Sequence, residues 1–270
     1  MDRAARLFEE AGCRSGVLDD VLVNGRRFYS FSDEPFIPVE FAVAAYRMGH
    51  SMVRASYDYN RVFREGGVTP ATLDLLFRFS GRSGGGADVP IPSDWIIDWR
   101  RFFETRTADG PSLGASRKIN PLLATPLQNI PPTVGSLAVA NFLRGAARGL
   151  PSGQAVAAAM SISPFTAGDF GAAAPHPDSV ITASGLGDAT PLWYYILKEA
   201  ELAGGEHLGA VGNRIVAEVF VGLLQGDPES FLAQQPTWTP TLGGVAGTFE
   251  MSDLLRYVGD LNPIGDAVPA

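Results

Sequence analysis

The chain has 270 residues, of which 46% are hydrophobic and 19% are charged, and its formal net charge is −8 at pH 7. A chain of this length can bury a hydrophobic core without disulfides. The single cysteine, Cys13, excludes an internal disulfide and a cysteine-based zinc site. The acidic balance excludes the basic surface that nucleic-acid binding requires. No membrane span is expected, because the sequence contains no run of about 18 apolar residues.

The first half of the chain predicts one β-hairpin and two helices. Residues 21–31 (VLVNGRRFYSF) predict a small hairpin, because Asn24-Gly25 is a typical two-residue hairpin turn. Residues 38–60 predict a helix, since apolar residues recur there at three- and four-residue steps and a proline opens the segment. Residues 69–81 predict a further helix that ends at a glycine.

The second half of the chain predicts three more helices, at residues 188–205, 208–227 and 252–259. Glycine- and proline-rich residues at 80–94 and 167–188 predict long loops. Neither loop separates regions of different composition, so we expect one domain. The predicted fold class is mainly α, with long loops and little β structure.

His50 is the first of only three histidines in the chain, and small or apolar residues surround it. On a helix, Arg47 lies one turn before it, and Gly49 leaves the imidazole without a neighbouring side chain. A histidine and a fixed cation on a thin helix suit a flat anionic cofactor such as haem. A core histidine hydrogen-bonded to a carbonyl group has the same local pattern. These residues alone therefore leave both interpretations open.

The wider segment PFIPVEFAVAAYRMGHSMVRASYDYN resembles the proximal-helix segment of bacterial members of the animal haem peroxidase family, within the peroxidase–cyclooxygenase superfamily. Three later segments resemble the same family in the same order: SLAVANFLRGAARGLPSGQAVA, TPLWYYILKEAELAGGEHLGAVGNRIVAEVFVGLL and FEMSDLLRYVG. The resemblance implies the C-terminal, proximal part of that fold. It implies a single partial domain over residues 1–270, with a connector at 1–37, the proximal helix at 38–60 and the remaining helices and loops at 61–270.

The resemblance also implies a haem site. His50 matches the proximal ligand of the haem iron, and the implied cofactor is haem b or a modified form of it. Arg47 matches an arginine near a haem propionate, and Arg144 matches a second haem-site arginine. Asn141 matches the asparagine that accepts a hydrogen bond from the other imidazole nitrogen. Without the resemblance, Asn141 would be interpreted as a helix cap or a surface residue.

Two departures from the family pattern bear on function. Cyclooxygenase-type members carry a radical-forming tyrosine three positions before the ligand histidine, where this chain has Arg47. The sequence therefore resembles the peroxidase branch. The family's distal histidine and arginine lie upstream of the proximal helix, but no histidine precedes His50 here. Neither His176, in a proline-rich loop, nor His207, between two helices, fits a distal base.

Three functional hypotheses follow from the resemblance. The first is a haem peroxidase that reduces hydrogen peroxide and oxidises small electron donors, with a missing N-terminal half as its partner. The second is a haem-binding fragment without true peroxidase turnover. The third is a structural protein whose pocket stays empty and whose helical surface makes protein contacts.

Overall fold

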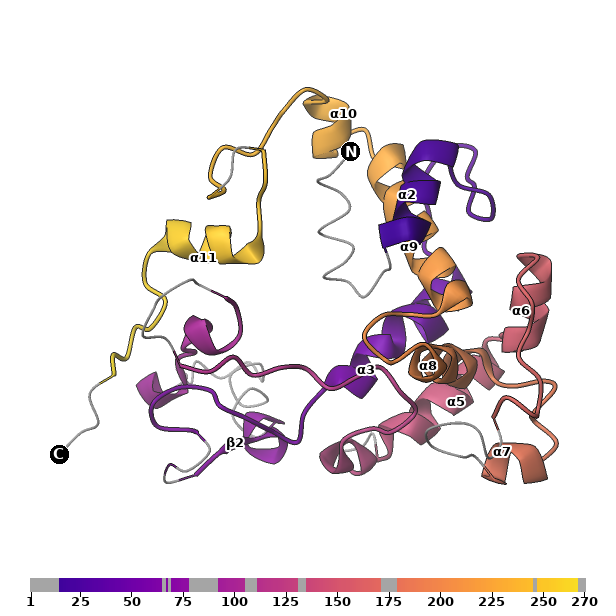
Figure 1. Ribbon diagram of the computed structural model, residues 1–270, viewed down its shortest axis with the longest axis horizontal. Helices are drawn as coiled ribbons and strands as arrows, with labels where there is room; N and C mark the ends of the chain where they lie inside the picture. The colour runs from indigo at the N-terminus through magenta and orange to yellow at the C-terminus, as the bar shows by residue number, and fades with distance from the viewer. Residues whose placement is uncertain are drawn as a thin grey trace. The chain divides into compact units, whose positions relative to one another are not determined.

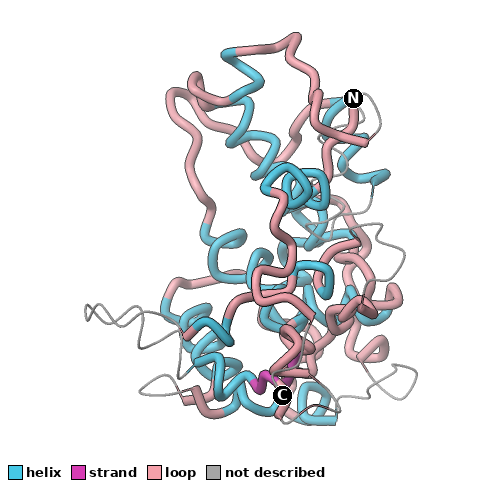
Figure 2. The backbone as a smooth tube through the Cα atoms, turned by 90° about the vertical axis from the view of Figure 1, so that its left-hand side faces the viewer, coloured by secondary structure: helices cyan, strands magenta, loops and turns pink. Residues whose placement is uncertain are grey.

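The computed structural model describes residues 15–64, 67, 69–77, 92–104, 111–130, 135–170, 179–244 and 247–266. Helices separated by long loops make up most of this part of the chain, and strands contribute one short pair (Figures 1 and 2). The predicted mainly α fold class is therefore confirmed. Within the same residues, no helix combines the length and the apolar character needed to cross a membrane.

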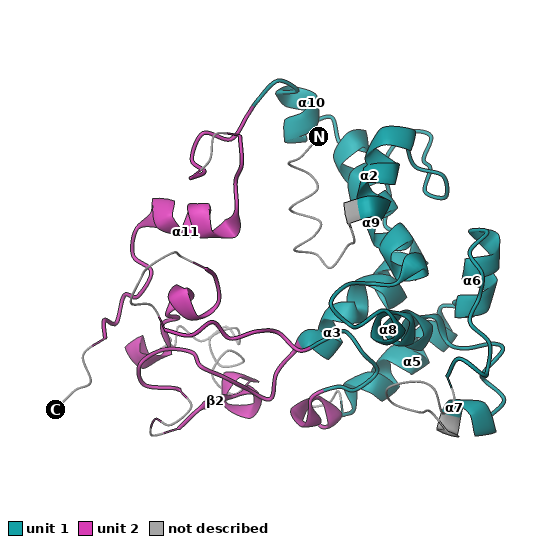
Figure 3. Ribbon diagram, in the orientation of Figure 1, with its two compact units in different colours: residues 1–52, 118–123, 134–238 teal, residues 53–117, 124–133, 239–270 magenta. Residues whose placement is uncertain are grey.

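The chain divides into two compact units, which Figure 3 shows in different colours. Unit 1 consists of Met1–Met52, Lys118–Leu123 and Val134–Trp238, and unit 2 consists of Val53–Arg117, Ala124–Thr133 and Thr239–Ala270. A division into compact units does not set the number of domains. The single partial domain expected over residues 1–270 stays a prediction.

Unit 1 holds most of the helices: α2 (Ser15–Asn24), α5 (Leu137–Ala147), α6 (Gly153–Ala159), α7 (Ser179–Ala183), α8 (Leu192–Leu202), α9 (Ala210–Gly226) and α10 (Phe231–Gln234). It also holds a helical segment of changing geometry, namely the π-helical turn η1 (Glu40–Ala44), the 3-10 turn η2 (Ala45–Met48) and α3 (Gly49–Met52). The centre of its core is α8, which packs against α5 and α9 (Figure 1). Tyr195 and Ile196 of α8 are fully buried.

Unit 2 holds the strands β1 (Ser56–Tyr57) and β2 (Ala71–Thr72), the short turns η3 (Ser93–Trp95), η4 (Trp99–Arg101) and η5 (Thr125–Gln128), and the helix α11 (Met251–Val258). The strands pair antiparallel, with Ser56 opposite Thr72. Phe63, Ala71 and Trp95 form its own small core.

The predicted hairpin at residues 21–31 is wrong. The helix α2 continues to Asn24, and Gly25 follows with φ +82°. An Asn-Gly pair suits a helix C-terminus as well as a hairpin turn, because glycine adopts the left-handed conformation that ends a helix. Burial decides between the two, since Leu18 and Val21 lie three residues apart and are both buried in the core of unit 1.

The proximal helix predicted over residues 38–60 is also shorter than expected, because helical backbone ends at Met52. The amide of Arg54 donates a hydrogen bond to the Tyr57 hydroxyl at 3.0 Å, and Tyr57 then pairs with Ala71 as part of β1. A strand partner distant in the sequence therefore takes these residues out of the helix. The helix predicted at 69–81 begins later than expected, because Ala71 and Thr72 belong to β2. Residues 73–77 are helical, and residues 78–81 lie outside the described residues.

The predicted helices in the second half of the chain are confirmed as α8, α9 and α11, with α8 shorter at both ends than predicted. The loop predicted at 167–188 contains the short helix α7, and residues 171–178 lie outside the described part of the chain. Most of the loop predicted at 80–94 also lies outside it.

Gly153 provides a test of the packing between α6 and α8. A Cβ atom at this position would lie 2.0 Å from Cγ of Tyr195, whose side chain is fully buried. We expect Gly153→Ala to lower the free energy of unfolding by about 1–3 kcal/mol, because a close-packed core does not yield to an added methyl group. Urea denaturation measures the change.

The matched control is Gly16→Ala in α2, where an added Cβ meets no atom within 4 Å. Alanine is the better helix former, so this variant should be neutral or more stable by up to about 1 kcal/mol. Equal unfolding midpoints for the two variants would contradict the packing argument.

Candidate functional site

The structure brings together three of the four residues that the sequence predicted for a haem site. Arg47 lies in η2, His50 in α3 and Asn141 in α5. Asn141 Nδ2 lies 3.0 Å from His50 Nδ1, and Arg47 Nη1 donates a hydrogen bond to Asn141 Oδ1. One amide side chain therefore contacts both the imidazole and the guanidinium, although 91 residues separate Asn141 from His50.

The backbone that carries Arg47 and His50 is not the regular α-helix that the sequence predicted. It changes from a π-helical turn to a 3-10 turn at Ala44, whose φ and ψ are −124° and −75°. Ala44 and Ala45 are fully buried in the core, so small side chains let this segment approach its neighbours closely. Irregular turns of this kind inside helices occur frequently at functional sites.

Two aromatic residues hold α5 and η2 in place. Trp193 of α8 donates from Nε1 to the carbonyl oxygen of Arg47 at 3.3 Å. The Trp193 ring meets Phe142 of α5 edge to face, with centroids 5.4 Å apart. Phe142 follows Asn141 directly, so this contact positions the amide near His50. The sequence contained no signal for either role, because both depend on how α5 and α8 pack.

Asn141 occupies a buried position near the middle of α5. The Ser136 hydroxyl caps this helix by accepting a hydrogen bond from the Val139 amide. The side chain of Asn141 is 1% exposed, whereas Val139 and Leu143 on the same helix are exposed. The alternative interpretation of Asn141 as a cap or a surface residue is therefore wrong, because Ser136 caps the helix and Asn141 faces inward.

The electrostatics of the site favour a neutral imidazole beside two cations. Burial, followed by the charge of Arg47, lowers the pKa of His50 below its ordinary value, which favours the neutral form of the ring. Burial and the charge of Arg144 lower the pKa of Arg47. Arg144 is exposed on α5. Among the residues that the structure describes, no carboxylate pairs with either arginine, and Arg47 instead donates hydrogen bonds to the Ala42 carbonyl oxygen at 3.1 Å and to Asn141 Oδ1.

The orientation of the Asn141 amide differs from the one that the resemblance implies. Here Nδ2 donates to His50 Nδ1, so the neutral ring carries its proton on Nε2. A metal bound at Nε2 needs the opposite arrangement, in which Nδ1–H donates to Oδ1 of the amide. The amide has this orientation because Asn141 Oδ1 accepts a hydrogen bond from Arg47. These residues fit a haem group after two changes. The Asn141 amide rotates by about half a turn, and the Arg47 guanidinium exchanges its hydrogen bond to that amide for an anionic partner.

The structure describes one of the two remaining histidines. His207 has a buried Nδ1 atom without a hydrogen-bond partner in the described structure, and His176 lies outside the described residues. Over the same described ranges, no three His, Cys, Asp or Glu side chains gather as a metal cluster would require. Tyr46, beside Arg47, is exposed, and its ring stacks on Phe41 with centroids 4.9 Å apart.

No protein-family model matches this sequence, and no curated protein matches it. Among solved structures, the chain is similar to Peroxidase A from Dictyostelium discoideum (DdPoxA), with 16% sequence identity and a TM-score of 0.48. The similarity covers 89% of this chain and 45% of that one. This chain therefore spans less than half the length of the peroxidase that it matches.

Proposed function

We propose that this chain binds haem through His50 and forms the proximal side of a peroxidase. The observation that carries the proposal is the contact of one buried amide, that of Asn141, with both the His50 imidazole and the Arg47 guanidinium. A ligating imidazole needs a partner on its second nitrogen to set its orientation. A haem group needs cations for its two propionates, and Arg47 and Arg144 are close enough for the charge of one to shift the pKa of the other.

Each residue has a distinct part in the proposed site. His50 Nε2 binds the iron, and Asn141 Oδ1 holds the proton on Nδ1. Arg47 and Arg144 pair with the propionates, while Trp193 keeps the backbone of Arg47 in place through its indole N–H. When bound, haem b supplies the redox chemistry that reduces hydrogen peroxide and oxidises small donors. The groups that activate peroxide on the opposite face belong, in this proposal, to a further length of polypeptide.

One observation favours the alternative that His50 has only a structural role. In the present amide orientation Nδ1 accepts a hydrogen bond from Asn141, which is the satisfied arrangement of a core histidine. In that case the chain would be a structural fragment that does not bind haem. The two proposals differ in whether added haem acquires an axial ligand from His50.

The experiment is a haem titration followed by absorption spectroscopy. We expect the wild-type chain to shift and sharpen the Soret band, and His50→Ala to lose that change, because the ligand is gone. His207→Ala is the matched control and should retain the wild-type spectrum. Circular dichroism of all three chains checks the fold. Identical spectra for wild type and His50→Ala would remove the ligand assignment and leave the structural alternative.

A further inference from the structure

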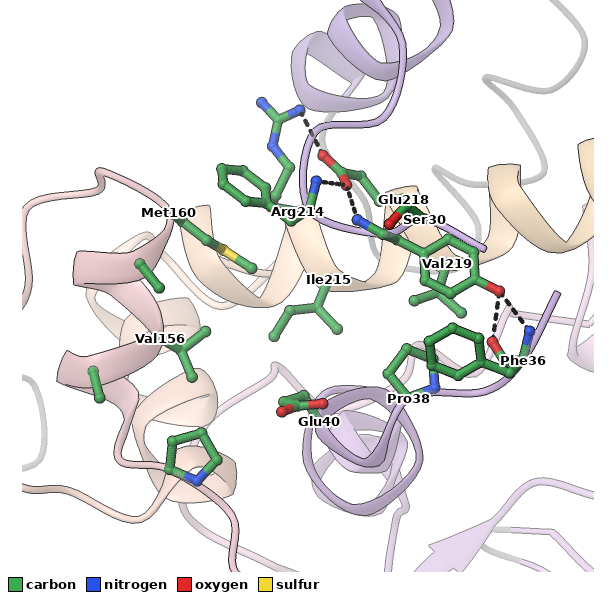
Figure 4. Close-up of a pocket in the computed structure, with 15 residues that line it drawn as sticks. Ser30, Phe36, Pro38, Glu40, Val156, Met160, Arg214, Ile215, Glu218 and Val219 are labelled. Atoms are coloured by element: carbon green, nitrogen blue, oxygen red, sulfur yellow. Dashed lines mark hydrogen bonds and ion pairs between the residues drawn. The ribbon is translucent and has the colours of Figure 1, made fainter. Parts of the chain in front are cut away.

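One pocket in unit 1 is lined by none of the proposed haem-site residues. Its volume is about 550 Å³, and it lies between the loop after α2, the turn η1 and the helices α6 and α9 (Figure 4). A volume between about 300 and 1,000 Å³ is typical of small-molecule sites. The pocket therefore has the size to hold one small ligand.

Most of the pocket wall is apolar. Ile215 of α9 lies at its centre in Figure 4. Val156 of α6 and Met160, the residue after α6, lie on one side, and Phe36 and Pro38 lie on the other. Val156 and Ile215 are already buried, whereas Phe36 is exposed. An apolar body of the size of a benzene ring would remove the exposed part of this wall from water on binding.

The charged groups of the pocket leave one carboxylate free. Glu218 accepts hydrogen bonds from the backbone amides of Phe28 and Tyr29 at 2.7 and 2.9 Å. Arg214 pairs with Asp20 at 2.6 Å and lies 3.6 Å from Glu218, so two carboxylates offset its charge.

The free carboxylate is that of Glu40, which lies beneath Ile215 in Figure 4. It is half-buried, and its side chain has no hydrogen bond or ion pair among the described residues. The pocket thus combines an apolar wall with an unpaired negative charge and a net negative balance. A cation with an apolar body satisfies both features, whereas a carboxylate ligand would meet repulsion from Glu40.

We propose that this pocket binds a small apolar monoamine, whose ammonium group pairs with Glu40 and whose aromatic or branched body lies against Ile215, Val156 and Met160. The proposal rests on this pocket alone and does not depend on haem binding. The net charge of the whole chain, −8, also raises the local concentration of cations near its surface.

The test is a ¹H–¹⁵N NMR titration of the full chain with 2-phenylethylammonium as the probe. We expect saturable shifts of the backbone amides of Val156, Met160 and Ile215. Phenylacetate and the neutral 2-phenylethanol should bind at least about fivefold more weakly, since they cannot form the ion pair with Glu40. Equal affinity for the amine and either analogue would overturn the proposal.

Two matched pairs of variants locate the site. Glu40→Gln should weaken amine binding by about fivefold, whereas Glu34→Gln, at an exposed carboxylate in the loop before η1, should leave it unchanged. Ala159→Trp fills the pocket from α6 and should abolish binding. Ala158→Trp, at an exposed neighbour that does not line the pocket, should not. Circular dichroism of all four variants checks the fold, and the proposal fails if the folded members of either pair bind the amine alike.

Discussion

Replacing Asn141 by leucine is expected to weaken the affinity for haem by about 10- to 100-fold, which is the usual effect of removing the hydrogen-bond partner of a ligating histidine. The leucine has nearly the same size, but it leaves the Nδ1–H of a ligated His50 buried without an acceptor. Fluorescence quenching of the four tryptophans during a haem titration would measure the dissociation constant.

Asn141→Asp tests whether the side chain at position 141 orients the His50 imidazole or only fills space in the core. The aspartate keeps an acceptor for Nδ1–H, so the affinity for haem should recover. Its charge gives the imidazole more anionic character, so the reduction potential of the bound iron should become more negative than in the wild-type protein. Leu143→Ala, on the exposed face of the same helix, is the control and should change neither quantity. Wild-type affinity in Asn141→Leu would show that Asn141 does not orient the ligand.

Glu199→Ala is expected to lower the free energy of unfolding by about 2–4 kcal/mol, because it leaves buried amides at the start of α9 without an acceptor. The Glu199 carboxylate lies in α8 and is 4% exposed. It accepts hydrogen bonds from the Val211 amide at 3.0 Å and from the Gly212 amide at 3.2 Å. Gly209 has no side chain, and this permits the approach, since a Cβ there would lie 2.0 Å from Cγ of Glu199.

The control for this prediction is Glu206→Ala, at an exposed position in the turn between α8 and α9, which should change stability by less than about 0.5 kcal/mol. Thermal and urea unfolding would compare the two variants. A Glu199→Ala chain as stable as Glu206→Ala would show that α9 does not need this buried cap.

The same carboxylate makes stability depend on pH. Burial raises the pKa of Glu199 above its ordinary value of 4.5, against the opposing effect of the backbone hydrogen bonds. The folded chain therefore binds this proton more tightly than the unfolded chain does. The stabilisation that comes from this tighter proton binding is complete below pH 4.5. It is lost as the pH rises through the raised pKa of Glu199. Relative to Glu199→Gln, which does not titrate, the wild-type chain should lose stability over that interval.

Local periodicity was sufficient to predict the helices that the core buries. The apolar steps in residues 188–205 and 208–227 predicted α8 and α9, because a helix is formed by contacts between residues three and four apart. The resemblance likewise brought His50, Arg47 and Asn141 together as one site before any distance was known. Residue types and local spacing therefore predicted the mainly α fold class, whereas the candidate site followed from the resemblance and not from spacing.

Contacts between distant residues decided the rest. The Asn24-Gly25 pair ends α2 because Leu18 and Val21 are buried in the core, which the pair itself does not encode. The helix predicted over residues 38–60 ends at Met52 because β2 pairs with the residues that follow. The orientation of the Asn141 amide depends on Arg47, 94 residues away. The hydrogen bonds between β1 and β2 and between Arg47 and Asn141 form only after distant segments pack. No local pattern in the sequence can therefore predict them.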